Sequence, residues 1–232
     1  MMLRFLGTGS AFNPTKVNTS AIYRPYTSTL LLIDCGERVF QKLLNSAILT
    51  EVTNLYVFIT HTHSDHIGSL STLIHYMYYK KNVKTNIITP LNSDNYVKDI
   101  LLHMGNTEEQ FTEVSPDDYD LVRTLNLSEI HTLPVQHTNL KSYAIELVDT
   151  DDYVTVYTGD TNDTEYLKRC LKYEKLHKIY CDISFYKGVH LDFNAAIELF
   201  KDYKNKVVFM HFDNNNIELE LRGLGFKVAE EI

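Results

Sequence analysis

The sequence predicts an α/β protein in which two mixed β-sheets pack together and helices cover their outer faces. Apolar runs of strand length alternate with segments of helical periodicity along both halves of the chain. Several strand-like runs follow one another with only a short turn between them, which predicts adjacent hairpins. Because the apolar face of a sheet must be covered, the helices are expected on the outside of the two sheets.

The first half opens with a short strand, Leu3–Leu6, followed by a turn at Gly7-Thr8-Gly9-Ser10. A buried strand over Leu55–Ile59 runs directly into a histidine-rich loop. The helix predicted next, Ile67–Tyr79, has apolar residues at helical spacing. The other elements expected in this half are strands over Thr29–Asp34 and Asn86–Thr89 and helices over Arg38–Leu49 and Asn95–His103.

The second half repeats the alternation after a polar stretch at residues 104–120, which is expected to be a solvated connection. The expected strands are Ile130–Val135, Ser142–Leu147, Val154–Tyr157, Lys178–Cys181, Lys206–Met210 and Phe226–Ala229. The expected helices are Asp163–Tyr173, Asn194–Tyr203 and Ile217–Leu221.

Length and charge limit the classes of function. A chain of 232 residues can bury a sizeable core, and a single domain over residues 1–232 is expected. The formal net charge is −8, which does not favour a long nucleic acid, because phosphate backbones require a basic surface. A small anionic substrate is compatible with this charge if a metal site supplies positive charge locally.

The cysteines and the apolar segments indicate the cellular compartment. Cys35, Cys170 and Cys181 are odd in number and show no CxxC spacing, so three reduced, buried or half-buried thiols are expected. The N-terminus lacks the apolar core of a signal peptide, and no window reaches the ~18 apolar residues of a membrane span. A cytoplasmic protein without a membrane segment is expected.

Four metal-ligating side chains lie within six residues, directly after a strand. In Thr60-His61-Thr62-His63-Ser64-Asp65-His66, alternation in an extended chain places His61, His63 and Asp65 on one side. His66 then turns inward as the chain enters the next helix. Burying these groups together without a cation would be costly, and imidazole and carboxylate are typical ligands of zinc and similar divalent ions. The loop therefore predicts metal binding.

Three further ligand-type residues follow later strands. His137 comes after Ile130–Val135, Asp160 lies in Tyr157-Thr158-Gly159-Asp160-Thr161, and His211 comes after Met210. The ends of strands are the usual place for a site in a sheet protein. We expect these residues to complete the site that the histidine-rich loop begins.

In this order, the seven residues resemble the ligand set of the metallo-β-lactamase superfamily. The resemblance covers nearly the whole chain and implies an αβ/βα sandwich with two divalent ions, Zn²⁺ or alternatively Mn²⁺. It implies His61, His63 and His137 on one ion, with Asp65, His66 and His211 on the other. Asp160 would bridge the two ions.

Other segments are similar to ribonuclease Z and its phosphodiesterase relatives. These segments are Leu6-Gly7-Thr8-Gly9-Ser10-Ala11, Leu32-Ile33-Asp34-Cys35-Gly36-Glu37 and Asp182-Ile183-Ser184-Phe185 followed by His190. The resemblance implies that His190 protonates the leaving group, with Asp182 orienting its ring, and that Asp65 accepts a proton as well as binding metal.

The chain departs from ribonuclease Z at the flexible arm with which that family grips transfer RNA. Only 22 residues separate His137 from Asp160, and two strands with a turn account for them. The chain is thus more similar to the cyclic-nucleotide phosphodiesterases of this branch, which include phage and bacterial anti-Pycsar enzymes. That similarity implies hydrolysis of a small 3′,5′-cyclic nucleotide to a 5′-monophosphate, against cyclic-nucleotide immune signalling. It also implies a homodimer, located in the host cytoplasm if a phage encodes the chain.

Three alternatives stay open on the sequence. They are a ribonuclease Z-like RNA 3′-processing nuclease, a lactonase or thioesterase on the same metal site, and a protein that sequesters a nucleotide without cleaving it. Aromatic side chains offer stacking surfaces for a base. The candidates are Tyr23, Tyr26, Tyr76, Tyr78 and Tyr79.

Overall fold

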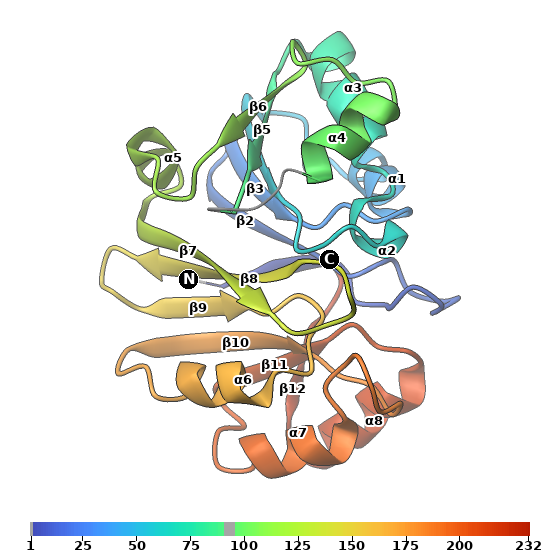
Figure 1. Cartoon of the computed structure of the whole chain (residues 1–232), viewed down its shortest axis with the longest axis vertical. Coiled ribbons are helices and arrows are strands. Elements are labelled where there is room, and N and C mark those ends of the chain that lie inside the picture. Colours follow the sequence, from blue (N-terminus) through green and yellow to red (C-terminus); the bar gives the residue numbers. More distant parts are fainter. Residues whose placement is uncertain (1, 91–95) are drawn as a thin grey trace.

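The computed structural model describes residues 2–90 and 96–232 and contains two six-stranded sheets packed face to face (Figure 1). The strand order of the first sheet is β1-β2-β3-β4-β5-β6, and that of the second is β12-β11-β10-β9-β8-β7. The first sheet comprises β1 (Arg4–Gly7), β2 (Ser20–Tyr26), β3 (Thr29–Ile33), β4 (Asn54–Phe58), β5 (Thr85–Ile88) and β6 (Phe111–Val114). The second comprises β7 (Leu127–Val135), β8 (Ser142–Asp149), β9 (Val154–Tyr157), β10 (Leu176–Asp182), β11 (Val207–Met210) and β12 (Lys227–Val228).

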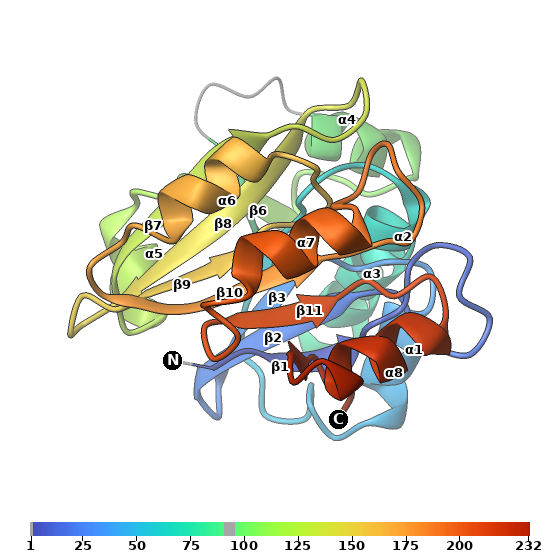
Figure 2. The ribbon, with the colours of Figure 1, turned by 90° about the horizontal axis from the view of Figure 1, so that it is seen from below.

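Helices cover the outer face of each sheet, as Figure 2 shows for α6, α7 and α8. The helices of the first half are α1 (Val39–Asn45), α2 (Ser64–Ile67), α3 (Leu70–Lys81) and α4 (Tyr96–His103). Those of the second half are α5 (Tyr119–Thr124), α6 (Thr164–Cys170), α7 (Phe193–Phe200) and α8 (Asn215–Gly223). The predicted arrangement of two mixed sheets with helices outside is therefore confirmed.

Three apolar layers hold the sandwich together. One lies between the first sheet and helices α1, α3 and α4, where Leu43, Leu73 and Leu101 are fully buried. A second lies between the second sheet and its helices, around Phe200 and Phe209. The third fills the space between the sheets. Burial of this much apolar surface is the main driving force for folding.

The direction of the strands brings their carboxyl ends to one edge of the sandwich. Strands β3 to β6 are parallel in the first sheet, and β9 to β12 are parallel in the second. Strand β7 has the same direction as β9, because both pair antiparallel with β8. The amide of Tyr143, on β8, donates to the carbonyl of Thr60 (3.0 Å), which links the sheets at this edge. Each predicted ligand lies at this edge of the sandwich. It either follows one of these strands or belongs to the helical turn of α2.

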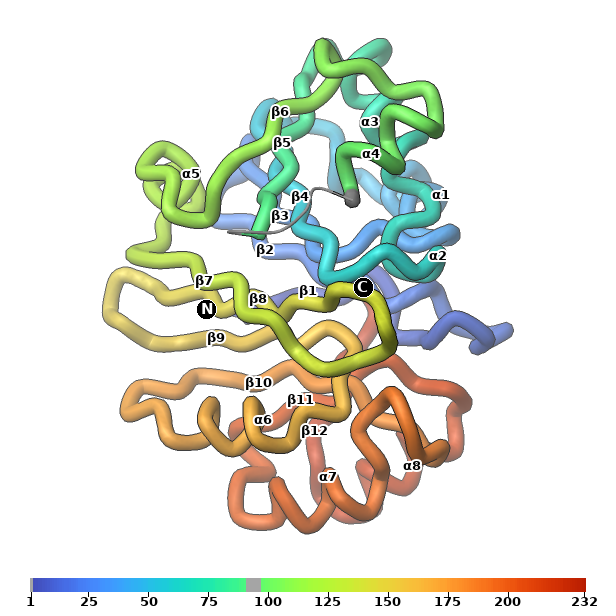
Figure 3. Tube along the Cα trace, viewed as in Figure 1, coloured from blue at the N-terminus to red at the C-terminus, as the bar shows by residue number. Residues whose placement is uncertain are grey.

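The last residues of the chain lie next to β1 (Figure 3). The amide of Ile232 donates to the carbonyl of Phe5 on β1 (2.9 Å), so the last residues close against the first strand. None of the helices in the described part of the chain has the length and apolar character that crossing a bilayer requires. The three cysteines are unpaired and buried, as predicted.

Some elements differ from the sequence-based expectation. The stretch 104–120 is not a plain solvated connection: it contains β6 and the start of α5, because Phe111 is buried and β6 pairs with β5. Strand β2 was not expected, since Pro25 interrupts its pattern; the register shifts between Tyr23 and Tyr26, which accommodates it. The helix expected over Ile67–Tyr79 is divided into α2 and α3. The expected start of α4, Asn95, lies outside the described residues.

Candidate metal centre

The histidine-rich loop changes from extended chain to helix at the point where its ligand-type residues lie. His63 is the extended N-cap residue of α2, and Asp65 and His66 fall in the first helical turn. The turn packs against the end of β3, where the amide of Cys35 donates to the carbonyl of His66. A Cβ on Gly36 would lie 1.9 Å from the carbonyl oxygen of Asp65, so only glycine permits this approach.

His61, His63 and His137 converge as one group. His61 Nε2 lies 2.8 Å from His63 Nδ1, and His137 Nε2 lies 3.4 Å from the same atom. The Nδ1 of His137 donates to the carbonyl of Val189 (2.9 Å), which directs its Nε2 toward the group. The three ring nitrogens all lie within 4.8 Å of one another, as ligands of one ion require.

Asp65, His66, Asp160 and His211 form a second, buried group. The Oδ2 atom of Asp160 is 3.3 Å from both His66 Nε2 and His211 Nε2. The same oxygen is 4.0 Å from His61 Nε2 and 3.9 Å from the Nε2 of His137 in the first group. Asp160 therefore lies between the two groups.

The chemistry of these side chains fits divalent cations. Asp160 Oδ1 is buried and has no hydrogen-bond partner, and a cation bound by this carboxylate would satisfy it. Imidazole and carboxylate are the ligands that zinc and similar ions prefer. The centre is thus a divalent-metal-binding site.

The surroundings of the first group favour neutral histidines. Burial is the main cause that lowers the pKa of His61, His63 and His137, and neighbouring imidazoles lower it further. A neutral imidazole is the form that binds metal. These three side chains are therefore ready to coordinate an ion without losing a proton.

His66 behaves differently, because two carboxylates surround it. Burial opposes its charge, yet Asp160 and Asp34 outweigh burial and raise the pKa of His66 well above its ordinary value. Conversely, His211 and His66 hold the pKa of Asp160 well below its usual range, although burial opposes this. The two carboxylates thus favour a proton on His66, and this proton would compete with an ion for the ring nitrogen.

Asp34 supports the centre from behind and was not assigned a role on the sequence. Its Oδ2 accepts from His66 Nδ1 (2.9 Å), and its Oδ1 accepts from the amide of Thr60 (2.8 Å). The hydroxyl of Tyr157 also donates to Oδ2 (3.3 Å). Asp34 is fully buried and has φ = 62°, a left-handed conformation that a non-glycine residue adopts only when its surroundings impose it. Such a carboxylate orients a metal-binding imidazole and raises its basicity.

Asp182 and His190 form a pair beside the second group. His190 Nδ1 lies 2.9 Å from Asp182 Oδ2 and 3.7 Å from Asp160 Oδ2. Burial alone lowers the pKa of His190, but the hydrogen bond to Asp182 and the charge of Asp160 raise it to about 9. Burial raises the pKa of Asp182 to about 6, although the bond to His190 opposes this. The two residues that the sequence predicted as a pair are therefore brought together.

A cavity of ≈540 Å³ opens over the centre. Its lining includes His63, Asp65, His137, Asp160, His190 and His211, together with Ser10, Ala11, Phe12, Glu37, Ser64, Val189 and Asp213. None of the five tyrosines suggested for stacking lines it, so that expectation is wrong. Tyr23 packs against the core between the sheets, Tyr76 contacts Phe40, and Tyr79 bonds to Gln110. Tyr23 and Tyr76 are thus packed within the fold, whereas Tyr79 is exposed away from this cavity.

The fold and the sequence both have known counterparts. The model of the family described as anti-Pycsar protein Apyc1 matches residues 1–228. The anti-Pycsar protein Apyc1 of Bacillus phage vB_BveM-Goe7 is 29% identical over 243 aligned positions, covering 92% of this chain and 89% of that protein.

Among solved structures, the metallo-β-lactamase fold protein YhfI from Bacillus subtilis aligns with a TM-score of 0.71 at 16% identity. The alignment covers 98% of this chain and 94% of that one. The short form of human tRNase Z aligns with a TM-score of 0.69 at 18% identity, covering 100% and 97%. The sandwich is thus a metallo-β-lactamase fold. The chain is a metal-dependent hydrolase, and it belongs to the anti-Pycsar protein Apyc1 family.

Proposed function

We propose that this chain is a dinuclear phosphodiesterase that opens 3′,5′-cyclic mononucleotides to 5′-monophosphates. One observation supports the proposal: Asp160 lies between two groups of ligand-type side chains, and His190, which is bonded to Asp182, lies beside the same carboxylate at one cavity. Two adjacent cation sites and a proton donor are the parts that hydrolysis of a phosphodiester requires.

Each group of ligands would hold one ion. His61, His63 and His137 would bind the first ion, and Asp160 would bridge to the second. The second ion would be bound by Asp65, His66 and His211. Divalent ions, Zn²⁺ or alternatively Mn²⁺, would supply an acidified water and neutralise the phosphate oxygens.

The remaining chemistry belongs to side chains of the cavity. The bond from His190 Nδ1 to Asp182 fixes the ring and leaves Nε2 as the nitrogen that donates a proton to the departing 3′ oxygen. The raised pKa of His190, about 9, keeps the ring protonated at neutral pH. Asp65, whose carboxylate lines the cavity and stays ionised, would accept the proton of the attacking water.

The size of the site favours a small substrate. The cavity of ≈540 Å³ falls in the range of ~300–1,000 Å³ that is usual for small-molecule pockets. The chain between His137 and Asp160 is occupied by β8 and β9, which leaves no room for an RNA-gripping arm. The relatives described as anti-Pycsar proteins support the same choice, since the resemblance implies cyclic mononucleotides and a role against cyclic-nucleotide immune signalling.

A substrate panel tests the proposal. Metal-loaded protein is incubated with 3′,5′-cyclic AMP, GMP, CMP and UMP, and in parallel with a lactone and a precursor transfer RNA, with chromatography as the readout. We expect 5′-monophosphates from the cyclic nucleotides and no comparable turnover of the other two. Preferred cleavage of the lactone or the RNA would replace the proposal, and intact nucleotide after long incubation would indicate a binding protein.

We further propose that the protein is a homodimer that acts in the cytoplasm, that of the host if a phage encodes it. Helix α3 exposes the ring of Tyr79, which is 68% accessible. Light scattering at micromolar concentration should give twice the monomer mass of 26.9 kDa; a mass near the monomer value would exclude the dimer.

A further inference from the structure

Phe12 is the most exposed of the large apolar side chains in the described part of the chain. It lies on the loop after β1, is 95% accessible and lines the cavity over the metal centre. Its neighbours along the loop are different: Ser10 is 5% accessible and Asn13 is 1% accessible. An exposed phenyl ring between buried residues gains nothing from hydrophobic burial in the free protein.

Hydrogen bonds hold the loop on both sides of Phe12. The amide of Ser10 (3.1 Å) and the side-chain amide of Asn13 (2.8 Å) both donate to the carbonyl of Phe212, the residue after His211. The carbonyl of Asn13 accepts from the guanidinium of Arg38 (2.6 Å). The backbone that carries Phe12 is therefore attached to the strand end that carries a metal-binding histidine.

The chemistry of the cavity separates into two parts. The floor consists of the imidazoles and carboxylates of the metal centre with His190, which suits the phosphate. The rim at Phe12 is an aromatic ring without hydrogen-bonding groups, which suits the flat face of a base. Because the backbone on both sides of Phe12 is fixed, stacking on a ligand would order only the side chain of Phe12, which lowers the entropic cost of binding.

We propose that Phe12 is the stacking surface for the nucleobase of the substrate. This inference rests on the proposed phosphodiesterase function and adds to it the residue that binds the base. Since every base presents a π-face and a phenyl ring reads no base edge, Phe12 contributes affinity for any nucleobase without selecting one.

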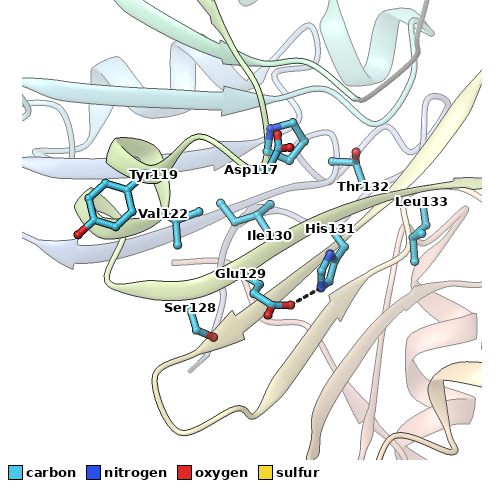
Figure 4. Close-up of a pocket in the computed structure, with 10 residues that line it drawn as sticks. Asp117, Tyr119, Val122, Ser128, Glu129, Ile130, His131, Thr132 and Leu133 are labelled. Carbon is cyan, nitrogen blue, oxygen red and sulfur yellow. Dashed lines mark ion pairs between the residues drawn. The ribbon is translucent and has the colours of Figure 1, made fainter.

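A second cavity supplies a matched control. It has a volume of ≈500 Å³ and lies between α5 and β7, where Figure 4 shows Tyr119 and Val122 near Ile130. Tyr119 is an exposed aromatic at 76% accessibility, and the residues that line this cavity include none of the proposed metal ligands. Tyr119→Ala thus removes a comparable exposed ring away from the centre.

The test compares wild type, Phe12→Ala, Phe12→Trp and Tyr119→Ala. The substrates are 3′,5′-cyclic CMP, 3′,5′-cyclic AMP and an abasic 1-deoxyribose 3′,5′-cyclic phosphate. We expect Phe12→Ala to raise KM for both nucleotides about 5- to 150-fold, the factor that loss of one stacked base implies. Turnover number should change less than about threefold, because stacking is distant from the reacting bond.

The other variants and the abasic compound make the readout specific. Phe12→Trp should restore KM, Tyr119→Ala should match wild type, and no variant should alter KM for the abasic compound. An unchanged KM in Phe12→Ala overturns the inference alone, as does an equal rise on the abasic compound. A lower oligomeric mass for Phe12→Ala would also overturn it, by assigning the ring to self-association. Failure of the wild type to cleave any cyclic nucleotide overturns the proposed function and this inference together.

Discussion

Glu146 and Asp160 are both buried carboxylates in the second half of the chain, but their surroundings differ. Glu146, on β8, is 3% accessible and accepts from the hydroxyls of Tyr166 (2.9 Å) and Tyr173 (3.0 Å). Asp160, just beyond β9, is 2% accessible and is surrounded by histidine nitrogens, and its Oδ1 has no partner.

The difference shows that burial of an acid does not by itself indicate a metal site. Burial and the nearby carboxylate raise the pKa of Tyr166 and Tyr173, so both phenols keep the protons that they donate to Glu146. Neutral donors of this kind satisfy a carboxylate without a cation. Asp160 Oδ1 has no such donor, and a cation bound by this carboxylate would satisfy it. Substitutions at the two carboxylates and at the groups around Asp160 should therefore have very different effects.

Removal of the shared carboxylate should abolish the function. Asp160→Ala is expected to lower turnover at least ~10³-fold, because the two ions lose their common ligand and the charge stabilisation they provide. Elemental analysis should fall from two ions per chain to one or none, while circular dichroism stays native. Near-normal turnover would refute the bridging role.

Removal of the proton donor should separate two kinds of substrate. His190→Ala is expected to slow hydrolysis of a cyclic nucleotide by ~10²–10⁴-fold, the usual contribution of a general acid. Cleavage of bis-(p-nitrophenyl) phosphate should stay within about tenfold of wild type, since p-nitrophenolate leaves without a proton.

Metal content is the control for His190→Ala and should be unchanged, because His190 is outside the proposed ligand set. Equal losses on both substrates would instead indicate that His190 positions the substrate.

Loss of the Asp34 charge, which supports His66, should weaken metal binding less than loss of a ligand does. Asp34→Asn removes the charge opposite His66 Nδ1 and is expected to weaken metal binding by ~10–100-fold. Competition with a chromophoric chelator measures this affinity. The same affinity as wild type would show that Asp34 only holds the loop.

Metal binding should release a proton from His66. Because its pKa is raised in the metal-free fold, His66 is protonated at neutral pH, and this proton competes with the ion. Affinity for Zn²⁺ should therefore rise as pH increases, by about tenfold per unit while His66 stays mainly protonated. Calorimetry in two buffers of different ionisation enthalpy should give different heats; identical heats would contradict the protonated state.

Substitution of Glu146 is expected to affect the stability of the fold but not the metal centre. Glu146→Leu leaves two phenols without their acceptor and should lower the free energy of unfolding by ~1–3 kcal/mol. Turnover and metal content should match wild type within about twofold. A parallel loss of metal would mean that Glu146 also supports the centre.

Much of the fold and of the metal centre can be predicted from local sequence patterns. The loop His61–His66 is a compact cluster next to an apolar strand, and His137, Asp160 and His211 follow strand ends in the same way. Most helices and strands were also predicted, since their periodicity reflects burial on one face. Strand β2, with its Pro25, and strand β6, with its four residues, were missed because pairing with neighbours stabilises them.

The residues without a local pattern were also missed. Asp34 lies in a segment that resembles ribonuclease Z, but nothing in that segment shows that its carboxylate faces His66. Phe12 belongs to an unremarkable loop, and its exposure depends on bonds to Phe212, 200 positions away in the chain.

The class of fold and the ligand-type residues can thus be predicted from local sequence, because spacing along one strand or loop encodes both. Three facts emerge only from the packed chain: Asp160 lies between the two groups, Asp34 contacts His66, and tyrosine hydroxyls satisfy Glu146. These facts depend on distances between segments far apart in the chain, and the packing of the two sheets sets those distances.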